Sequence, residues 1–221
     1  MKQIGTNVQT IKIDIVSDVS CPWCIIGYQA LQIALNNLDD SISAVIQWHP
    51  FELNPNMPQE GQEINEHLSQ KYGIDEQQLT KNRNMIHARG LSVGYEFGNR
   101  GGGRIYNTFD AHRLLHLAKL EGKQTELKLA LFDLYFKESG NPSDHKQLLN
   151  KAELVGINKE AAEKVLTSTM YAEEVRHEQQ HYQSLGISSV PAFIINNKHL
   201  ISGGQPPDMF EKALKEITSQ R

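Results

Sequence analysis

The chain contains very little cysteine, with only Cys21 and Cys24 among 221 residues. Two cysteines cannot build the network of several disulfide bonds that holds many small secreted proteins together. In a reducing compartment, two cysteines this close in sequence are more often catalytic or metal-binding than structural. The pair is therefore the first candidate for the chemistry of this protein.

Targeting signals and long apolar runs are missing as well. Residues 1–10 lack the basic stretch, apolar core and small-residue cleavage site of a secretory signal. No uninterrupted apolar run approaches the ~20 residues that cross a bilayer. The formal net charge of -4 argues against nucleic acid or an acidic membrane as a general partner. We expect a cytoplasmic protein that binds neither nucleic acid nor membranes.

Length and composition indicate a globular chain. With 39% hydrophobic and 22% charged residues, the 221 residues can bury a sizeable core. The chain is long for one small domain and short for two ordinary ones. One compact domain with a large insertion fits this length.

The first part of the chain predicts a β-α-β unit. Residues 11–16 are rich in β-branched side chains and are typical of a buried strand. Pro22 falls where the first helical residue would be, which suits its fixed φ and missing N–H, and residues 39–41 would end the helix. Residues 43–49 predict a second strand, parallel to the first and reached by a right-handed crossover.

The middle of the chain, from about residue 61 to residue 185, has mainly helical periodicity. Leu127, Leu131 and Leu134 belong to one apolar stripe, and similar stripes follow it. Glycines fall near the expected ends of several helices, where this residue stops a helix well. The pattern predicts a block of helices.

The C-terminal part returns to strand character. Residues 192–195 and 199–202 predict two paired strands around a turn, and Pro206-Pro207 opens a final helix. The predicted fold class is α/β, with residues 10–55 and 186–221 forming one discontinuous domain. The inserted domain, residues 56–185, is predicted to be all-helical.

The segment Cys21-Pro22-Trp23-Cys24 lies between the first predicted strand and the first predicted helix. A cysteine pair at the start of a helix lies at the positive end of the helix dipole, where the first thiol can lose its proton near neutral pH. The thiolate is the form that attacks disulfides, so the pattern predicts redox chemistry. The alternatives are a zinc half-site, for which a second cysteine pair is missing, and two unrelated buried thiols.

Two other patterns suggest metal ions. The segment from His177 to His181 matches the zinc-protease pattern His-Glu-x-x-His, but the charged residues around it are typical of a solvated helix. His112 and His116 also stand four residues apart, with no third ligand evident. We expect no metal site.

Four segments, in order along the chain, carry a resemblance to a known family. They are residues 18–27 around the cysteines, residues 50–55, Asn107-Thr108 with residues 111–114, and residues 186–193. Together they resemble the DsbA-like branch of the thioredoxin superfamily and, within it, the cytoplasmic FrnE-like oxidoreductases. The resemblance implies a thioredoxin-like fold with a large helical insertion.

The resemblance also implies the roles of several residues. Cys21 would be the attacking thiol, and Cys24 the resolving thiol that releases the mixed disulfide. Val190-Pro191 would be a cis dipeptide beside them, and the backbone of Val190 would pair with an extended substrate peptide. An ordinary loop proline is the alternative.

Pro22 and Trp23, between the cysteines, are candidates for substrate contact. More familiar relatives have a histidine or glycine at one of these positions. Because an indole cannot hold a positive charge near Cys21, Trp23 argues against a strongly oxidising protein. Trp23 either offers the substrate a flat apolar contact or covers the core beside the helix.

Several polar residues are candidates for moving a proton or shaping a pocket. Asp18 either caps a backbone N–H or relays a proton for the resolving thiol. Glu52 and His49 are further relay candidates. Asn107 and His112, in the third matching segment, would cap a helix or line the substrate pocket.

The predicted function is that of a thiol–disulfide oxidoreductase of the protein disulfide reductase or isomerase type. It needs no organic cofactor or metal, because the two thiols carry the electrons. Expected partners are protein disulfides or dithiols, with glutathione or a thioredoxin system for recycling and glutathione as a candidate co-substrate. One alternative is a glutathione-dependent enzyme acting on a small molecule, similar to 2-hydroxychromene-2-carboxylate isomerase or kappa-class transferases, which usually have serine in place of Cys21. A holdase chaperone is the non-enzymatic alternative.

Overall fold

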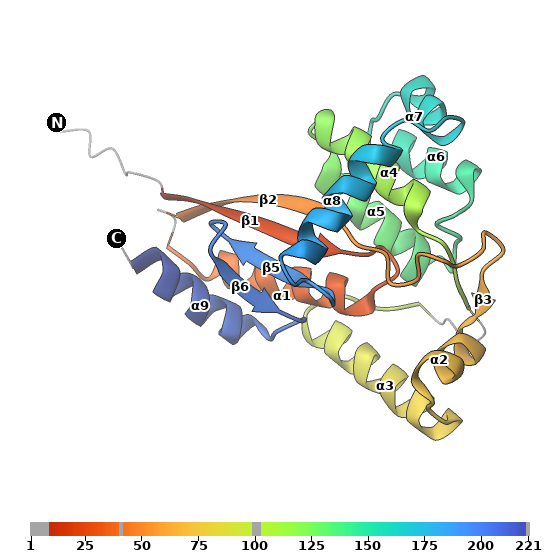
Figure 1. Ribbon diagram of the computed structural model, residues 1–221. Coiled ribbons are helices and arrows are strands. Elements are labelled where there is room, and N and C mark those ends of the chain that lie inside the picture. The colour runs from red at the N-terminus through yellow and green to blue at the C-terminus, as the bar shows by residue number, and fades with distance from the viewer. Residues whose placement is uncertain (1–8, 40–41, 99–102, 220–221) are drawn as a thin grey trace.

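The main sheet has four strands in the order β2–β1–β5–β6, in a computed structural model that describes residues 9–39, 42–98 and 103–219 (Figure 1). The strands are β1 (Gln9–Ser17), β2 (Ile42–Pro50), β5 (Ala192–Ile195) and β6 (His199–Ser202). Strands from the two ends of the chain are therefore neighbours in one sheet.

The β-α-β unit confirms the prediction made from the sequence. Strands β1 and β2 are parallel, with Ile13 opposite Ile46, and α1 (Pro22–Asn36) connects them. Ile11, Ile13 and Ile15 are fully buried in the cluster that includes α1, because alternate residues of a strand point to the same face. Pro22 is the first residue of the helix.

Strands β5 and β6 form the antiparallel hairpin predicted at residues 192–195 and 199–202. Asn196 and Asn197 make its turn with φ of 52° and 55°, left-handed values that asparagine adopts more readily than most residues. Strand β5 also pairs antiparallel with β1. The last helix, α9 (Pro207–Ser219), packs against α1.

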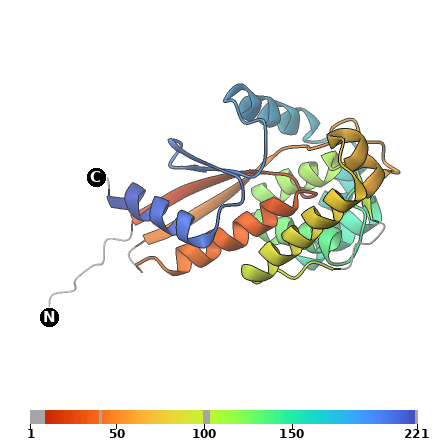
Figure 2. The same cartoon turned by 90° about the horizontal axis from the view of Figure 1, so that it is seen from below.

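Between β2 and β5 the described segments form seven helices. They are α2 (Ile64–Tyr72), α3 (Glu76–Ser92), α4 (Phe109–Leu120), α5 (Gln124–Phe136), α6 (His145–Leu154), α7 (Lys159–Leu166) and α8 (Ala172–Ser184). Helices α4 to α7 pack around a second apolar cluster, and α8 packs on β2. In Figure 2 the strands lie between α8 and the layer formed by α1 and α9. No helix of the described ranges is long and apolar enough to cross a membrane.

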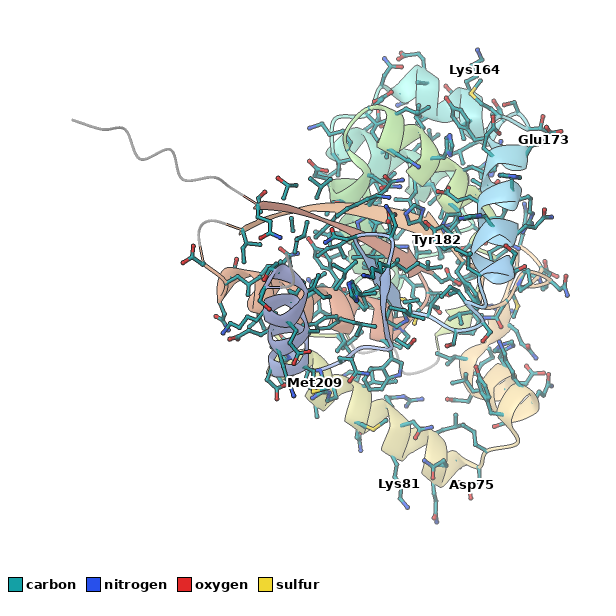
Figure 3. All side chains as sticks on the ribbon, turned by 60° about the vertical axis from the view of Figure 1, so that its left-hand side comes forward. Asp75, Lys81, Lys164, Glu173, Tyr182 and Met209 are labelled. Atoms are coloured by element: carbon teal, nitrogen blue, oxygen red, sulfur yellow. The ribbon has the colours of Figure 1, made fainter. Side chains whose placement is uncertain are left out.

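The insertion is not entirely helical, which corrects one detail of the prediction. Strand β3 (Gln62–Glu63) pairs antiparallel with β4 (Arg104–Ile105). Strands of two residues have no periodicity that a sequence pattern can reveal. The pair lies at the base of an arm made of α2 and α3, whose far end carries Asp75 and Lys81 (Figure 3).

The sheet and the inserted helices share one apolar core. Phe132, Tyr135 and Phe136 of α5 belong to the same buried cluster as the strands and α1. Val19, in the turn after β1, is buried in the cluster of the inserted helices. The segment that leads to the cysteines is therefore held by both parts of the molecule. The domain boundaries near residues 55 and 186 remain a prediction.

The side chain of Gln124, the first residue of α5, hydrogen-bonds to the backbone of β2. The N–H of Trp48 donates to Gln124 Oε1 at 2.9 Å, and Gln124 Nε2 donates to the Trp48 carbonyl oxygen at 2.9 Å. The amide of Gln124 thus satisfies both backbone groups of this residue, as a neighbouring strand would. These bonds fix the first turn of α5 against the sheet.

Candidate active site

Cys21 and Cys24 lie at the N-terminal end of α1. Cys21 is the N-cap residue, just before Pro22. Its N–H donates to the Asp18 carbonyl oxygen at 3.2 Å, and the Cys24 N–H donates to the Cys21 carbonyl oxygen at 3.1 Å. Cys21 is 3% exposed, Cys24 is fully buried, and both are free thiols. The turn that starts at Asp18 therefore fixes both sulfurs at the helix start.

The Val190–Pro191 peptide bond is cis, as the resemblance implied. The Cys21 thiol donates to the Val190 carbonyl oxygen across 3.7 Å, so the dipeptide lies beside this cysteine. The Pro191 carbonyl oxygen accepts from the Gly203 N–H at 2.8 Å, which ties the dipeptide to the turn after β6. Residues 188–189 are exposed. The backbone that leads to the dipeptide is therefore open to a binding partner.

Pro22 and Trp23 are both half-buried. The indole of Trp23 packs against the core of the sheet. Gly204 lies so close that a Cβ there would be 3.0 Å from the Trp23 carbonyl oxygen and 3.4 Å from its ring. Trp23 thus covers the core beside the helix, which was one of its two interpretations, and its remaining surface is open to solvent.

The single proton of the Cys21 thiol can be donated either to the Val190 carbonyl oxygen or to the Cys24 sulfur. The interaction with Cys24, and then burial, raises the pKa of Cys21 well above its ordinary value. Burial also acts to raise the pKa of Cys24, but the hydrogen bond from Cys21, the charge of Lys128 and the hydroxyl of Ser17 outweigh it and lower that pKa. In the reduced pair Cys24 therefore loses its proton more readily than Cys21, whereas the sequence pattern predicted a lowered pKa for Cys21.

Lys128, which the sequence patterns did not single out as a site residue, explains where the charge lies. It is 1% exposed on α5, and it interacts more strongly with Cys24 than with Cys21. The dipole of α1 acts from one helix end alone and does not include the charge that α5 brings to the site. The sequence did contain one sign of this residue. Lys128 lies on the same apolar helix face as Leu131 and Phe132, and lysine is rarely buried in such a position without a partner.

Asp18 is 1% exposed and accepts hydrogen bonds from the backbone. Its Oδ2 accepts from the Leu53 N–H at 2.8 Å, and its Oδ1 accepts from the Ser20 N–H at 3.3 Å. Burial acts to raise the pKa of Asp18, but the nearby His112, 3.6 Å from Oδ1, and the Leu53 N–H outweigh it and lower that pKa. Asp18 thus accepts from two backbone N–H groups, as the first of its two interpretations expected, and its charge also acts to raise the pKa of Cys21.

His112 and Asn107 both fasten the loop after β2 to α4. The Nε2 of His112, which is 3% exposed, donates to the Phe51 carbonyl oxygen at 2.9 Å. Asn107 Nδ2 donates to the Met57 carbonyl oxygen at 3.2 Å, and its Oδ1 accepts from the Phe109 N–H at 2.9 Å. Asn107 thus supplies the side-chain bond at the start of α4. The two residues position the loop that also holds Asp18 through its backbone.

The other two relay candidates, Glu52 and His49, are bonded to α8. Glu52 accepts from Gln179 Nε2 at 3.0 Å. His49 bonds through Nε2 to Asp14 and through Nδ1 to Glu178, both at 2.7 Å. These contacts join the end of β2 and the residues after it to α8. Among the described residues, Glu52 Oε1 is buried and has no hydrogen-bond partner.

The His-Glu-x-x-His pattern lies on α8 and is divided between two environments. Glu178 bonds to His49, whereas His177 and His181 are exposed. In the part of the chain that the structure describes, no group of three or more histidine, cysteine, aspartate or glutamate side chains could hold a metal ion. His112 and His116 stay without a third ligand in that same part.

Known proteins resemble this chain over almost its whole length. The profile of the DSBA-like thioredoxin domain family matches residues 12–215. The chain is 30% identical to a probable DsbA oxidoreductase from Streptomyces coelicolor, whose crystal structure has a TM-score of 0.89 over 96% of this chain and 91% of that one. It is also 28% identical to the uncharacterized protein YwbO of Bacillus subtilis (strain 168), over 94% of this chain and 97% of that protein. A 2-hydroxychromene-2-carboxylate isomerase shares the fold at 14% identity, with a TM-score of 0.70 over 95% of this chain and 97% of that one.

The family match runs from β1 to α9 and includes both cysteines and the cis dipeptide. The expected fold class, an α/β thioredoxin-like fold with a helical insertion, is confirmed. The chain belongs to the DSBA-like thioredoxin domain family and is a DsbA-like thiol–disulfide oxidoreductase with its Cys-x-x-Cys pair at residues 21–24.

Proposed function

We propose that this protein reduces or isomerises disulfides of protein substrates, in the cytoplasm and in the manner of the FrnE-like oxidoreductases. The placement of the Cys21 thiol supports this most, because it interacts with the Cys24 thiol on one side and lies within hydrogen-bond reach of the Val190 carbonyl oxygen, beside a cis proline, on the other. The first contact supplies a resolving thiol. The second lies on a strip of backbone suited to an extended peptide, whose disulfide would then face Cys21.

The reaction consists of two exchanges between sulfurs. Cys21, as a thiolate, attacks one sulfur of the substrate disulfide; a new S–S bond forms, the substrate bond breaks, and the second substrate sulfur leaves as a thiolate. Cys24 then attacks the Cys21 sulfur, releases the first substrate sulfur as a thiolate and closes the Cys21–Cys24 disulfide. Two electrons pass to the substrate, and its two thiolates take up two protons.

The attacking thiolate forms by proton transfer along the hydrogen bond between the two thiols. With Cys24 anionic and Cys21 protonated, movement of one proton from Cys21 to Cys24 transfers the charge to the sulfur beside Val190. The positive end of α1 then lies next to that charge.

The direction of electron flow that we propose is from the protein to its substrates. Strong oxidants stabilise the thiolate of the attacking cysteine. Here the hydrogen bond to Cys24, burial and the charge of Asp18 raise the pKa of Cys21, and Trp23 brings no positive charge. In a reducing compartment, glutathione or a thioredoxin system would return the pair to the dithiol state.

Trapping of mixed disulfides tests this proposal. In Cys24→Ser protein the mixed disulfide at Cys21 cannot be resolved, so a disulfide-bonded protein such as insulin should stay attached and be visible on non-reducing gels. The wild-type protein with glutathione should reduce insulin, and Cys21→Ser protein should neither reduce nor trap it. Because the chain has only these two cysteines, each variant is the matched control of the other.

Two outcomes would contradict the proposal. If Cys24→Ser protein traps glutathione but no protein substrate, a glutathione-dependent enzyme acting on a small molecule is favoured. If wild-type and Cys21→Ser proteins suppress the aggregation of an unfolded client equally, and no disulfide is reduced, a holdase chaperone is favoured.

A further inference from the structure

Lys128 is buried near the cysteine pair among apolar rings. It is 1% exposed, and its Nζ lies 5.4 Å and 5.1 Å from the ring centroids of Trp48 and Phe132. The Ser17 carbonyl oxygen, 3.5 Å from Nζ, accepts a long hydrogen bond. Within the described part of the chain, Lys128 forms no ion pair with a carboxylate.

A buried ammonium group is costly unless an anion lies near it. Burial lowers the pKa of Lys128 from 10.5 to about 8, while the charges of Cys24, Asp18 and Cys21 act to raise it. Cys24 makes the largest of these three contributions. Because both thiol groups are lost when the disulfide forms, the main partner of Lys128 exists in only one redox state.

We propose that Lys128 is the acid–base partner of the cysteine pair: its ammonium group stabilises the Cys24 thiolate in the reduced protein, and it gives up its proton when the Cys21–Cys24 disulfide forms. This role rests on the exchange function proposed above. Lys128 lies on α5, one turn along the helix from Gln124, whose side chain bonds to β2. With this role for Lys128, one of the inserted helices takes part in the reaction.

The proton balance of substrate reduction closes when Lys128 is included. The reduced site holds one proton on the Cys21 sulfur and one exchangeable proton on the Lys128 ammonium group, with a thiolate at Cys24. When the pair passes two electrons to a substrate disulfide, one substrate thiolate takes the Cys21 proton and the other takes the Lys128 proton. The products are the Cys21–Cys24 disulfide, two substrate thiols and a neutral Lys128 amine, so the net charge does not change.

A small cavity gives Lys128 a way to exchange protons. Its volume is about 10 Å³, which accommodates about one water molecule. His116 lines the cavity and, among the described residues, has no hydrogen-bond partner for its buried Nδ1. Burial lowers the pKa of His116, which favours the neutral ring that can accept a proton. The titratable side chains around the cavity are Lys128, His49, His112, His116, Lys119 and Glu178.

A thiolate titration of the reduced protein tests the proposal. The ultraviolet absorbance of the thiolate would be followed against pH in wild-type, Lys128→Met and Lys151→Met proteins. Methionine keeps much of the length and apolar contact of lysine without its charge. We expect Lys128→Met to raise the midpoint of the first thiolate by ~1–3 pH units, the effect of removing a close opposite charge. Lys151→Met removes a lysine bonded to Glu138 elsewhere in the inserted helices and should leave the midpoint unchanged.

A second measurement keeps the proposal testable if Lys128→Met protein does not fold. In the unmodified protein, NMR titration of isotope-labelled lysines gives the pKa of Lys128 in both redox states, and we expect the lower value in the disulfide form. The proposal is overturned by an unchanged thiolate midpoint in folded Lys128→Met protein, or by a Lys128 pKa that is equal in both states. Neither measurement uses a substrate. A shifted titration without insulin reduction would therefore count against the proposed function alone.

Discussion

Replacing Lys128 by methionine should make the cysteine pair a stronger reductant. The charge of Lys128 favours the Cys24 thiolate of the reduced protein, and the disulfide form offers it no such partner. Removing the charge therefore raises the free energy of the reduced protein relative to the oxidised protein. As a result, the reduction potential of the Cys21–Cys24 pair should become more negative.

The burial of the three groups sets the size of this shift. Lys128 is 1% exposed, Cys21 3% and Cys24 0%, so water screens their interaction only weakly. A close opposite charge changes a pKa by about 1–3 units. In a two-electron couple, a tenfold change in the equilibrium constant corresponds to about 30 mV. We therefore expect the reduction potential of Lys128→Met protein to lie about 30–90 mV below that of the wild type.

The pH dependence separates this effect from a general disturbance of the fold. Because the pKa of Cys24 is lowered, the stabilisation of the reduced state is present above that pKa and is lost as the pH falls through it. Potentials would be measured by equilibration in glutathione redox buffers with thiol trapping. The difference between the two proteins should be largest between the lowered pKa of Cys24 and the pKa of Lys128, which is about 8. It should shrink in acid, where Cys24 is protonated, and again at higher pH, where Lys128 loses its charge. A variant that is equally or more oxidising than the wild type within this window would contradict the role of Lys128.

Two further predictions concern contacts that hold the site in place. Burial acts to lower the pKa of His49, but Asp14 and Glu178 outweigh it and raise that pKa. The two carboxylates therefore stabilise the folded protein through the charged form of His49. This stabilisation is fully present below the ordinary pKa of 6.5 and is lost as the pH rises through the raised pKa. In urea denaturation, His49→Leu should cost about 3 kcal/mol near pH 6 and clearly less near pH 9, and an equal cost at both would contradict this. Gln124→Ala removes two hydrogen bonds to the Trp48 backbone and should lower the free energy of unfolding by about 2 kcal/mol. An unchanged denaturation midpoint would show that this amide does not hold the strand.

Local signals were sufficient to locate β1, β2, the first helix and the C-terminal hairpin. The alternation in residues 11–16, the proline at position 22 and the pair Asn196-Asn197 each act on the backbone within a few residues. Their effect can therefore be derived from the sequence alone. The cis bond before Pro191 is different, because an X–Pro pair does not reveal its isomer and only the resemblance to a family predicted it.

The charge beside the resolving thiol could not be located in this way. Lys128 is far from Cys24 in sequence, and the two meet only because α5 packs against both α1 and β2. The pattern did contain a lysine on the same helix face as the buried Leu131 and Tyr135, and a lysine in that position needs a partner. Which partner it finds depends on helix packing, which periodicity does not encode.

The charge of Lys128 near Cys24 also favours reduction of substrate disulfides over their isomerisation. An isomerase must keep its mixed disulfide long enough for another substrate thiol to attack it, whereas a reductase needs rapid release by the resolving thiol. In the mixed disulfide Cys21 has no proton to donate, but Lys128 and Ser17 still favour the thiolate of Cys24, so release should be fast. We therefore expect the protein to reduce insulin faster than it restores scrambled ribonuclease, and we expect Lys128→Met to shift that ratio toward isomerisation. An identical ratio in the two proteins would mean that Lys128 does not act on the resolving step.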